Sequence, residues 1–264
     1  MKIGVALAAG LSAALLTACD QRSAADRTKT HQVRVAAASD LRFALNELAR
    51  RFEADHDVKV MASYGSSGTF YTQLLNQAPF DLFLSADLEY PRQLAARGLT
   101  IDGTEFQYAV GRLVVWTRRS SGLDLEAAGL RTLADPAVAH VAIANPAHAP
   151  YGRAAVAAMQ SAAVYDAVRQ NLVFGENVEQ ALQFAQSGAA DVGIVALSLA
   201  LAPPVKDQGR YVIVPLETYP RITQGGIILR WAADVDSARA LRAFIIGAEG
   251  RAVLKRYGFF LPES

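Results

Sequence analysis

Strand-length and helix-length hydrophobic patterns alternate along the first hundred residues. Residues 33–38 form a short, mostly apolar run, whereas over 40–55 apolar residues recur at the three- and four-residue spacing of a helix. A strand over 58–63, a helix over 70–77, a strand over 81–86 and a helix over 88–97 follow in the same way. This alternation predicts a parallel, doubly wound α/β unit.

A second α/β series follows a long β-like segment over 107–118, which we interpret as a crossing between two lobes. Its predicted elements are a strand over 140–144, a helix over 152–162, a strand over 172–174, a helix over 177–187 and a strand over 191–196. A strand over 225–230 and a helix over 236–256 remain at the end. We therefore expect a first lobe of 33–115 plus 225–264, a second lobe of 116–224, and hinge crossovers near 107–118 and 215–225.

The N-terminus has the pattern of an export signal. Lys2 precedes an uncharged apolar run over 3–18, which is too short to span a bilayer and is typical of a secretory signal peptide. The run ends in Leu16-Thr-Ala-Cys19, which resembles the bacterial lipobox, and Cys19 is the only cysteine. We predict a lipoprotein signal peptide over 1–18, lipidation of Cys19 and a flexible polar tether over 19–32. The alternative is a chance cysteine behind an ordinary signal peptide.

The charge balance argues against nucleic-acid binding. The chain has 26 Lys and Arg and 25 Asp and Glu residues, and removal of the signal with Lys2 would leave 25 of each. A nucleic-acid-binding protein normally shows a basic excess.

Asp20, directly after Cys19, resembles the signal that keeps Gram-negative lipoproteins in the inner membrane.

Patterns for catalysis are weak. The segment Tyr64-Gly-Ser-Ser-Gly-Thr69 has neither the Gly-x-Ser-x-Gly spacing of a nucleophile elbow nor the Gly-Lys-Ser/Thr of a phosphate-binding loop. No zinc or calcium ligand spacing occurs in the sequence. The four histidines are scattered: His31 lies in the predicted tether, and we interpret His56, His140 and His148, which fall near turns, as solvated surface residues. The sequence therefore favours a protein that is not an enzyme.

An anion-binding site fits the serines better. Ser39 lies where the first predicted strand meets its helix, and Ser66 and Ser67 lie at the next such junction. Helix N-termini offer free N–H groups and a positive dipole end, and open α/β sheets place ligands at the carboxyl ends of their strands. The alternative is that each serine only caps its helix, which contributes about 1 kcal/mol.

Six segments in register resemble one family over about Val33 to Phe259. They are Ala36-Ala-Ala-Ser39, Tyr64-Gly-Ser-Ser-Gly-Thr69, Asp81-Leu-Phe-Leu-Ser-Ala-Asp87, Asn145-Pro146, Asp191-Val-Gly-Ile-Val195 and Arg256-Tyr-Gly-Phe259. The family is that of the molybdate-binding proteins of ABC importers. The resemblance implies a two-lobed periplasmic binding protein fold of type II, with parallel-rich mixed α/β sheets and flanking helices.

The resemblance also implies which residues bind a tetrahedral oxyanion between the lobes. They are Ser39, the backbone N–H of Asp40, Ser67, Tyr151 and the backbone N–H of Val178. No positive side chain takes part, and molybdenum is held only as its oxyanion, without a direct protein ligand. Two positions depart from the family pattern. Some family members have a tyrosine where this chain has Ala196, and we expect the phenol of Tyr151 to take the place of that lost donor. Asp40 adds a carboxylate, which must point away from a dianion or cap its own helix.

The function implied is the capture of molybdate, and also of tungstate, in the periplasm by a monomer anchored to the inner membrane by its lipid. The partners would be an ABC permease and its ATPase, with no cofactor and no nucleic acid. Neutral donors suit a fully ionised dianion, because each of its oxygens is an acceptor. A sulfate or phosphate receptor is the alternative within the same fold, since Asp40 could accept the proton of phosphate. A secreted serine hydrolase using Ser66 or Ser67 is the alternative from another class.

Overall fold

The computed structural model describes residues 31–262, and the predicted signal peptide, Cys19 and most of the tether lie outside the described residues. The tether prediction is wrong at its end, because strand β1 (His31–Ala38) already begins at His31. His31 and Gln32 pair with Val58 and Lys59 of the parallel strand β2 (Val58–Gly65), so strand pairing orders them. Within residues 31–262 no helix combines the length and hydrophobicity that crossing a bilayer requires.

The first of two five-stranded sheets has the order β2-β1-β3-β10-β4. Its other strands are β3 (Leu82–Ser85), β4 (Phe106–Gly111) and β10 (Ile222–Ile228). The central strand β1 is parallel to β2 and β3, whereas β10 runs antiparallel to β3 and β4. Val33, Val35, Ala36 and Ala37 are fully buried, because helices cover both faces of this sheet.

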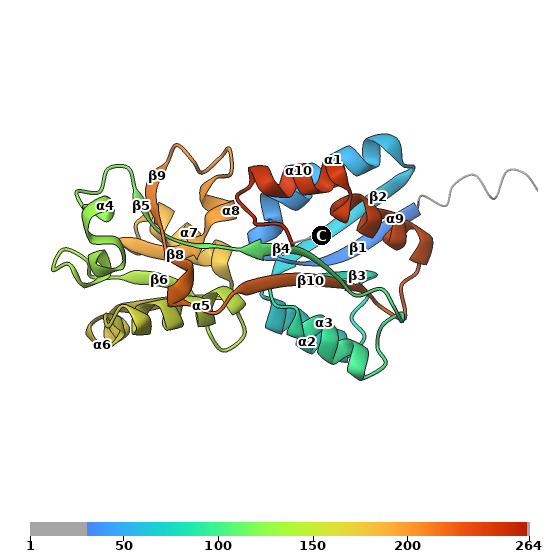
Figure 1. Cartoon of the computed structure of the whole chain (residues 1–264), viewed down its shortest axis with the longest axis horizontal. Coiled ribbons are helices and arrows are strands. Elements are labelled where there is room, and N and C mark those ends of the chain that lie inside the picture. The colour runs from blue at the N-terminus through green and yellow to red at the C-terminus, as the bar shows by residue number, and fades with distance from the viewer. Residues whose placement is uncertain (1–30, 263–264) are drawn as a thin grey trace, which may run out of the picture. The chain divides into compact units, whose positions relative to one another are not determined.

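Five principal helices flank the first sheet. They are α1 (Arg42–Asp55), α2 (Ser67–Leu75), α3 (Glu89–Ala96), α9 (Val235–Ile246) and α10 (Ala248–Arg256). Figure 1 shows α1, α9 and α10 on one face of the sheet and α2 and α3 on the other. The single helix predicted over 236–256 is two helices, because Gly247 is extended (ψ 174°) and ends α9 before α10 begins.

The second sheet has the order β7-β6-β8-β5-β9. Its strands are β5 (Leu113–Arg118), β6 (Val141–Ala144), β7 (Leu172–Gly175), β8 (Val192–Ala196) and β9 (Gly209–Ile213). Its helices are α4 (Leu125–Ala128), α5 (Pro150–Ser161), α6 (Tyr165–Val168), α7 (Val178–Ser187) and α8 (Leu197–Ala200). Strand β6 is parallel to β7 and β8, and β5 is antiparallel to β8 and β9. The α/β prediction with two mixed sheets is confirmed.

Two segments connect the sheets. The β-like run predicted over 107–118 is two strands that change sheets at Arg112, between Gly111 and Leu113. The chain returns between the end of β9 and the start of β10 at Ile222, and Figure 1 shows both crossings side by side. The predicted lobe boundaries and hinges stay a prediction, because a hinge is defined by motion.

Candidate functional site

A small cavity lies where strands of both sheets end, and all five residues implied by the family resemblance line it. Its volume is about 10 Å³, far below the roughly 300–1,000 Å³ of typical organic-ligand pockets, which leaves room for a small ligand at most. The lining residues are Ala38, Ser39, Asp40, Gly65, Ser66, Ser67, Ala86, Ala149, Pro150, Tyr151, Asn177 and Val178. We call this space the oxyanion cavity.

Four helix N-termini meet at the oxyanion cavity. Ser39 opens the 3-10 turn that leads into α1, Ser67 opens α2, Pro150 opens α5 and Val178 opens α7. Each follows a strand of one of the two sheets, as expected for the carboxyl ends of parallel strands. Free N–H groups and positive dipole ends converge there, so the surroundings favour negative charge without a cationic side chain.

The Ser67 hydroxyl is oriented to donate. Its Oγ accepts a hydrogen bond of 2.9 Å from the backbone N–H of Ala86, and the residue is only 1% exposed. Since this bond uses a lone pair of the oxygen, the hydroxyl hydrogen stays available for an acceptor in the cavity. Ser39 is also buried, at the end of the neighbouring strand β1.

The neighbouring Ser66 does not share this role. Its Oγ donates to the backbone oxygen of His148 at 2.5 Å, and it makes no side-chain cap for α2 although it occupies the N-cap position. The N–H of Gly68 donates to the same oxygen at 2.9 Å. A Cβ at Gly68 would lie 2.6 Å from that oxygen, so this glycine permits the turn before α5 to approach α2.

His148 is not simply a solvated surface residue, and that interpretation is wrong. Its side chain is 25% exposed, and its Nδ1 lies 3.0 Å from Ser66 Oγ. The turn that carries it leads directly into α5, so its backbone contacts connect the two sheets across the rim of the cavity.

Helix α7 presents the N–H of Val178 in a similar way. The side chain of Asn177, the N-cap residue, accepts from the N–H groups of Glu179 and Gln180 at 3.0 and 3.1 Å. This cap does not use the N–H of Val178, which lies at the first position of the helix and lines the cavity. The N–H of Val178 is therefore not used by the cap, and its role as an oxyanion donor stays a prediction.

Tyr151, Asp40 and Gln224 form a buried hydrogen-bonded cluster beside the cavity. The Tyr151 hydroxyl donates to Asp40 Oδ2 at 2.9 Å, and Gln224 Nε2 donates to the same oxygen at 2.5 Å. Burial raises the pKa of Asp40 to about 6, although these two hydrogen bonds lower it in part. Burial, together with the nearby Asp40, also raises the pKa of Tyr151 well above its ordinary value, so its phenol stays protonated.

No pattern in the sequence indicated Gln224, which directly precedes the strand predicted over 225–230. For Asp40, the option in which its carboxylate caps its own helix is wrong. The carboxylate does not cap its own 3-10 turn, whose N-cap position is Ala38 and which has no side-chain cap. It faces α5 and β10 instead. Ala196, the second departure from the family pattern, is fully buried at the end of β8 and is not among the residues that line the cavity.

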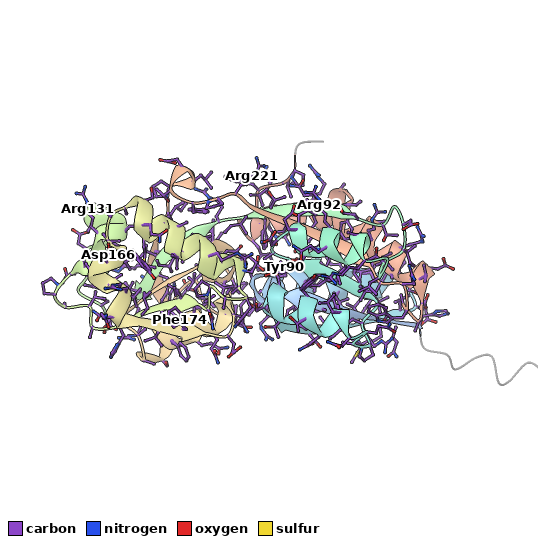
Figure 2. The ribbon with its side chains drawn as sticks, turned by 90° about the horizontal axis from the view of Figure 1, so that it is seen from below. Tyr90, Arg92, Arg131, Asp166, Phe174 and Arg221 are labelled. Carbon is purple, nitrogen blue, oxygen red and sulfur yellow. The ribbon has the colours of Figure 1, made fainter. Side chains whose placement is uncertain are left out.

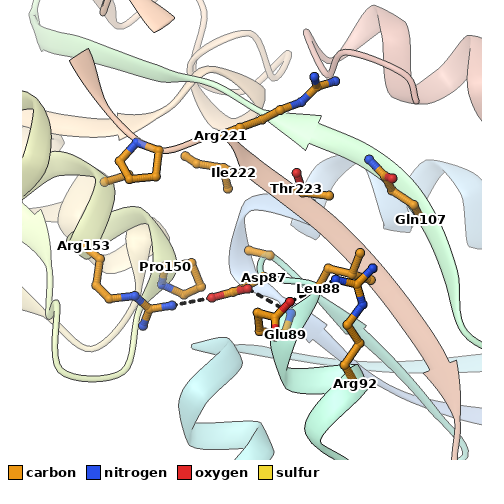
Figure 3. A pocket seen from close by; sticks show the side chains of 13 residues that line it. Asp87, Leu88, Glu89, Arg92, Gln107, Pro150, Arg153, Arg221, Ile222 and Thr223 are labelled. Carbon is orange, nitrogen blue, oxygen red and sulfur yellow. Dashed lines mark hydrogen bonds and ion pairs between the residues drawn. The ribbon is translucent and has the colours of Figure 1, made fainter. Parts of the chain in front are cut away.

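A larger open pocket adjoins the oxyanion cavity. Its volume is about 570 Å³, and it shares Ala86 and Pro150 with the cavity. Figure 3 shows Arg153 of α5 reaching Asp87 beside this pocket, with Nη2 and Oδ2 2.6 Å apart. Figure 2 shows Arg92 and Arg221 near the surface on the same side of the molecule.

A second ion pair joins the sheets on the other side of the cavity. Arg42 of α1 pairs with Glu179 of α7, and the Arg42 guanidinium lies 4.6 Å from the centre of the Tyr64 ring. Within residues 31–262 no cluster of three or more His, Cys, Asp or Glu side chains could hold a metal ion.

Comparisons with known proteins show the family of this chain. The family model for the bacterial extracellular solute-binding protein matches residues 33–260. A molybdate-binding protein of Azotobacter vinelandii is 36% identical over 260 residues, which are 98% of this chain and 97% of that protein. One from Rhodobacter capsulatus is 36% identical over 228 residues, 86% of this chain and 88% of that protein.

Solved structures show the same fold. The periplasmic molybdate-binding protein of Azotobacter vinelandii superposes with a TM-score of 0.82 at 32% identity, covering 88% of this chain and all of that chain. The sulfate-binding protein SubI of Mycobacterium tuberculosis shares the fold alone, with a TM-score of 0.71 at 16% identity over 88% of each chain. With the family model matching nearly the whole described chain, this protein belongs to the bacterial extracellular solute-binding protein family.

Proposed function

We propose that this protein captures molybdate in the periplasm and delivers it to an ABC permease. The observation that carries the proposal is the convergence of Ser39, Ser67, Tyr151 and the N-terminus of α7 on one small cavity. Two relatives that are 36% identical to this chain are molybdate-binding proteins, which supports the same ligand here. An organic solute would require a much larger space than the cavity's volume of about 10 Å³.

The donor set suits a tetrahedral dianion. Hydroxyl and backbone N–H groups can surround oxygens that only accept, and hydrogen bonds to a charged acceptor are stronger than those between neutral groups. Because no cationic side chain lines the cavity, affinity rests on the number and direction of these donors. Tungstate has the same shape and charge, so we propose that it binds as well.

The remaining parts of the proposal concern the cellular setting. We propose the five residues Ser39, Asp40, Ser67, Tyr151 and Val178 as the oxyanion site, with the donor of Asp40 being its backbone N–H. We further propose a monomer that is anchored to the inner membrane through Cys19 and docks on a permease with its ATPase. Domain closure over the ligand, with hinges at the two crossings, would present both lobes to the permease together.

A serine hydrolase is the second candidate, and one contact favours it. Ser66 Oγ lies 3.0 Å from His148 Nδ1, and His148 Nε2 lies 3.8 Å from Glu176. Against this, Ser66 donates its proton to the backbone oxygen of His148 at the shorter distance of 2.5 Å. A general base must receive that proton, so the geometry favours a structural contact. Activity on a chromogenic ester that is lost in Ser66→Ala would reverse this preference.

The proposed function is tested by calorimetry and thermal melting with molybdate, tungstate, sulfate and phosphate. A ligand that binds only the folded state stabilises it by RT ln(1 + [L]/Kd), about 4 kcal/mol at a thousandfold excess over Kd. We expect large and similar shifts with molybdate and tungstate and much smaller ones with sulfate and phosphate. If sulfate or phosphate raised the melting temperature more than molybdate does, that anion would be the ligand instead of molybdate.

A further inference from the structure

The oxyanion cavity contains a feature that opposes its proposed ligand. Asp40 is the only residue with an ionisable acid or base among those that line it, apart from the phenol of Tyr151. The residue is 1% exposed, so water does not screen its charge. An ionised carboxylate would repel a dianion at this distance in a poorly solvated site.

One oxygen of Asp40 lacks a donor. Oδ2 accepts from both Tyr151 and Gln224, whereas Oδ1 is buried and has no hydrogen-bond partner among the described residues. The Gln224 side-chain oxygen, Oε1, is buried without a partner as well. A buried acceptor without a donor is unfavourable, and a proton on Oδ1 would turn this acceptor into a donor.

The groups that face Asp40 do not neutralise its charge. They are the hydroxyls of Tyr151 from α5 and Tyr108 from β4, the amide of Gln224 from β10, and Ser198 from α8, which donates to the Asp40 backbone oxygen at 2.8 Å. None of these side chains is cationic. Arg42, the nearest cationic residue along the chain, pairs with Glu179.

We propose that this site binds its oxyanion together with one proton, which the Asp40 carboxyl holds on Oδ1 and shares with an oxyanion oxygen. The inference rests on the proposed function, because it concerns the same cavity. The proton comes from solvent when the ligand is fully ionised, and no covalent bond forms or breaks apart from the O–H bond of the carboxyl. Uptake of the proton lowers the negative charge in the cavity by one and adds one donor.

The direction of the pH dependence follows from this scheme. Burial raises the pKa of Asp40 to about 6, so the carboxyl is largely neutral at pH 5 and ionised at pH 8. Molybdate affinity should therefore be constant below about pH 5.5 and fall about tenfold per pH unit above about pH 6.5, as linkage to one proton requires. Hydrogen phosphate brings its own proton, which an ionised Asp40 can accept, so its weaker binding should fall less steeply.

The decisive comparison is between the wild-type protein and Asp40→Asn. The amide Nδ2 of asparagine is a donor at every pH, while its oxygen can still accept from Tyr151 and Gln224. Titration calorimetry with molybdate at pH 5.5, 6.5, 7.5 and 8.5, in buffers of different ionisation enthalpy, measures both the affinity and the protons taken up. Glu179→Gln is the matched control, because it removes a carboxylate near the cavity that makes an ion pair with Arg42.

We expect the wild type and Glu179→Gln to lose affinity by about tenfold per unit above pH 6.5 and to take up about one proton per molybdate at pH 7.5. Asp40→Asn should bind with a pH-independent affinity and without proton uptake. The proton proposal would be overturned if the molybdate affinity of the wild type did not change with pH and no proton were taken up. It would also be overturned if the affinity of Asp40→Asn fell with pH as steeply as that of the wild type. Either result would leave the proposed function standing. If neither protein bound molybdate at any pH while both melted cooperatively, the proposed function and the proton proposal would fail together.

Discussion

The hydroxyl of Tyr151 and the carboxylate of Asp40 are joined by a buried hydrogen bond of 2.9 Å, although the two residues are 111 positions apart in the chain. The bond links the first turn of α5, which flanks the second sheet, to the 3-10 turn that follows β1 of the first sheet. A ligand in the oxyanion cavity would touch the same two residues. The polar atoms of Tyr151 and Asp40 would therefore serve both ligand binding and the contact between the two sheets.

Tyr151→Phe should weaken molybdate binding by about tenfold to more than a hundredfold. In the proposed complex the Tyr151 hydroxyl turns its one hydrogen from Asp40 Oδ2 to the ligand, and the substitution removes this donor to a charged acceptor, which is worth about 1.5–3 kcal/mol. Tyr219→Phe is the control, because Tyr219 is also buried but its hydroxyl accepts from the N–H of Leu113 and does not line the cavity. Equal affinities of wild type and Tyr151→Phe in calorimetry would remove Tyr151 from the site.

The double variant Ser39→Ala/Ser67→Ala should fold and lose most of its oxyanion binding. Both hydroxyls line the cavity and neither caps its helix, but Ser67→Ala leaves the buried Ala86 N–H without its acceptor, so the loss of stability should be about 1–3 kcal/mol. Ser237→Ala, which removes a buried hydroxyl of α9, provides the comparison for loss of a hydroxyl alone. Thermal melting with and without molybdate measures both effects, and a wild-type ligand shift in the double variant would place the site elsewhere.

The ion pair between Arg153 and Asp87 should slow ligand release. It connects α5 to the loop after β3 beside the cavity, and its side chains are 42% and 28% exposed. Partly exposed pairs contribute about 0.2–1 kcal/mol, so Arg153→Gln should speed dissociation by up to about fivefold in a stopped-flow chase. Arg92→Gln is the matched control, since Arg92 pairs with Glu89 and Glu105. Equal dissociation rates for the two variants would exclude this contribution.

Asp40→Asn should stabilise the ligand-free protein at pH 7.5, and by only about half as much at pH 5. Burial raises the folded-state pKa of Asp40 to about 6, above the ordinary 3.8. A raised acid pKa stabilises the folded state below the unfolded pKa, and this stabilisation is lost as the pH rises through about 6. The gain in the variant at pH 7.5 should be about 2–3 kcal/mol at most. Urea unfolding at both pH values measures it, and an equal gain at both would refute the titration.

Cys19→Ser should leave the precursor uncut by the lipoprotein signal peptidase. The sequence Leu16-Thr-Ala-Cys19 at the end of an apolar run motivates this prediction, because the thiol is the atom that receives the lipid. Immunoblotting of membrane and periplasmic fractions checks it, with Ser23→Ala as a control outside the motif. Normal processing of the Cys19→Ser precursor to a soluble protein would exclude the anchor.

The serines of the cavity could be predicted because a simple rule places them. Ser39 and Ser67 follow neighbouring parallel strands, and the carboxyl ends of such strands share one edge. Gln224 could not be placed in this way, since it reaches Asp40 from 184 positions away on an antiparallel strand. Its hydrogen bond depends on the sheet order, which short-range patterns do not contain.

Two differences in the fold lie at an edge strand and at a helix end. Strand β9, at the edge of the second sheet, was not predicted although its Tyr211-Val-Ile213 run has high β propensity. The helix predicted over 236–256 has unbroken helical periodicity, but Gly247 adopts an extended conformation that ends it. Hydrophobic periodicity therefore predicted the central strands and helices, but it missed the edge strand β9 and the end of helix α9.

The position of β10 within the first sheet has a consequence for the order of folding. Strand β10 lies between β3 and β4, which are its two antiparallel partners. Until residues 222–228 emerge, β4 has no neighbour in that sheet and β3 has an open edge. An open edge binds other chains readily, and such long-range pairing forms slowly. A chain that stops before Ile222 should aggregate, whereas the complete chain closes its first sheet only with one of its last strands.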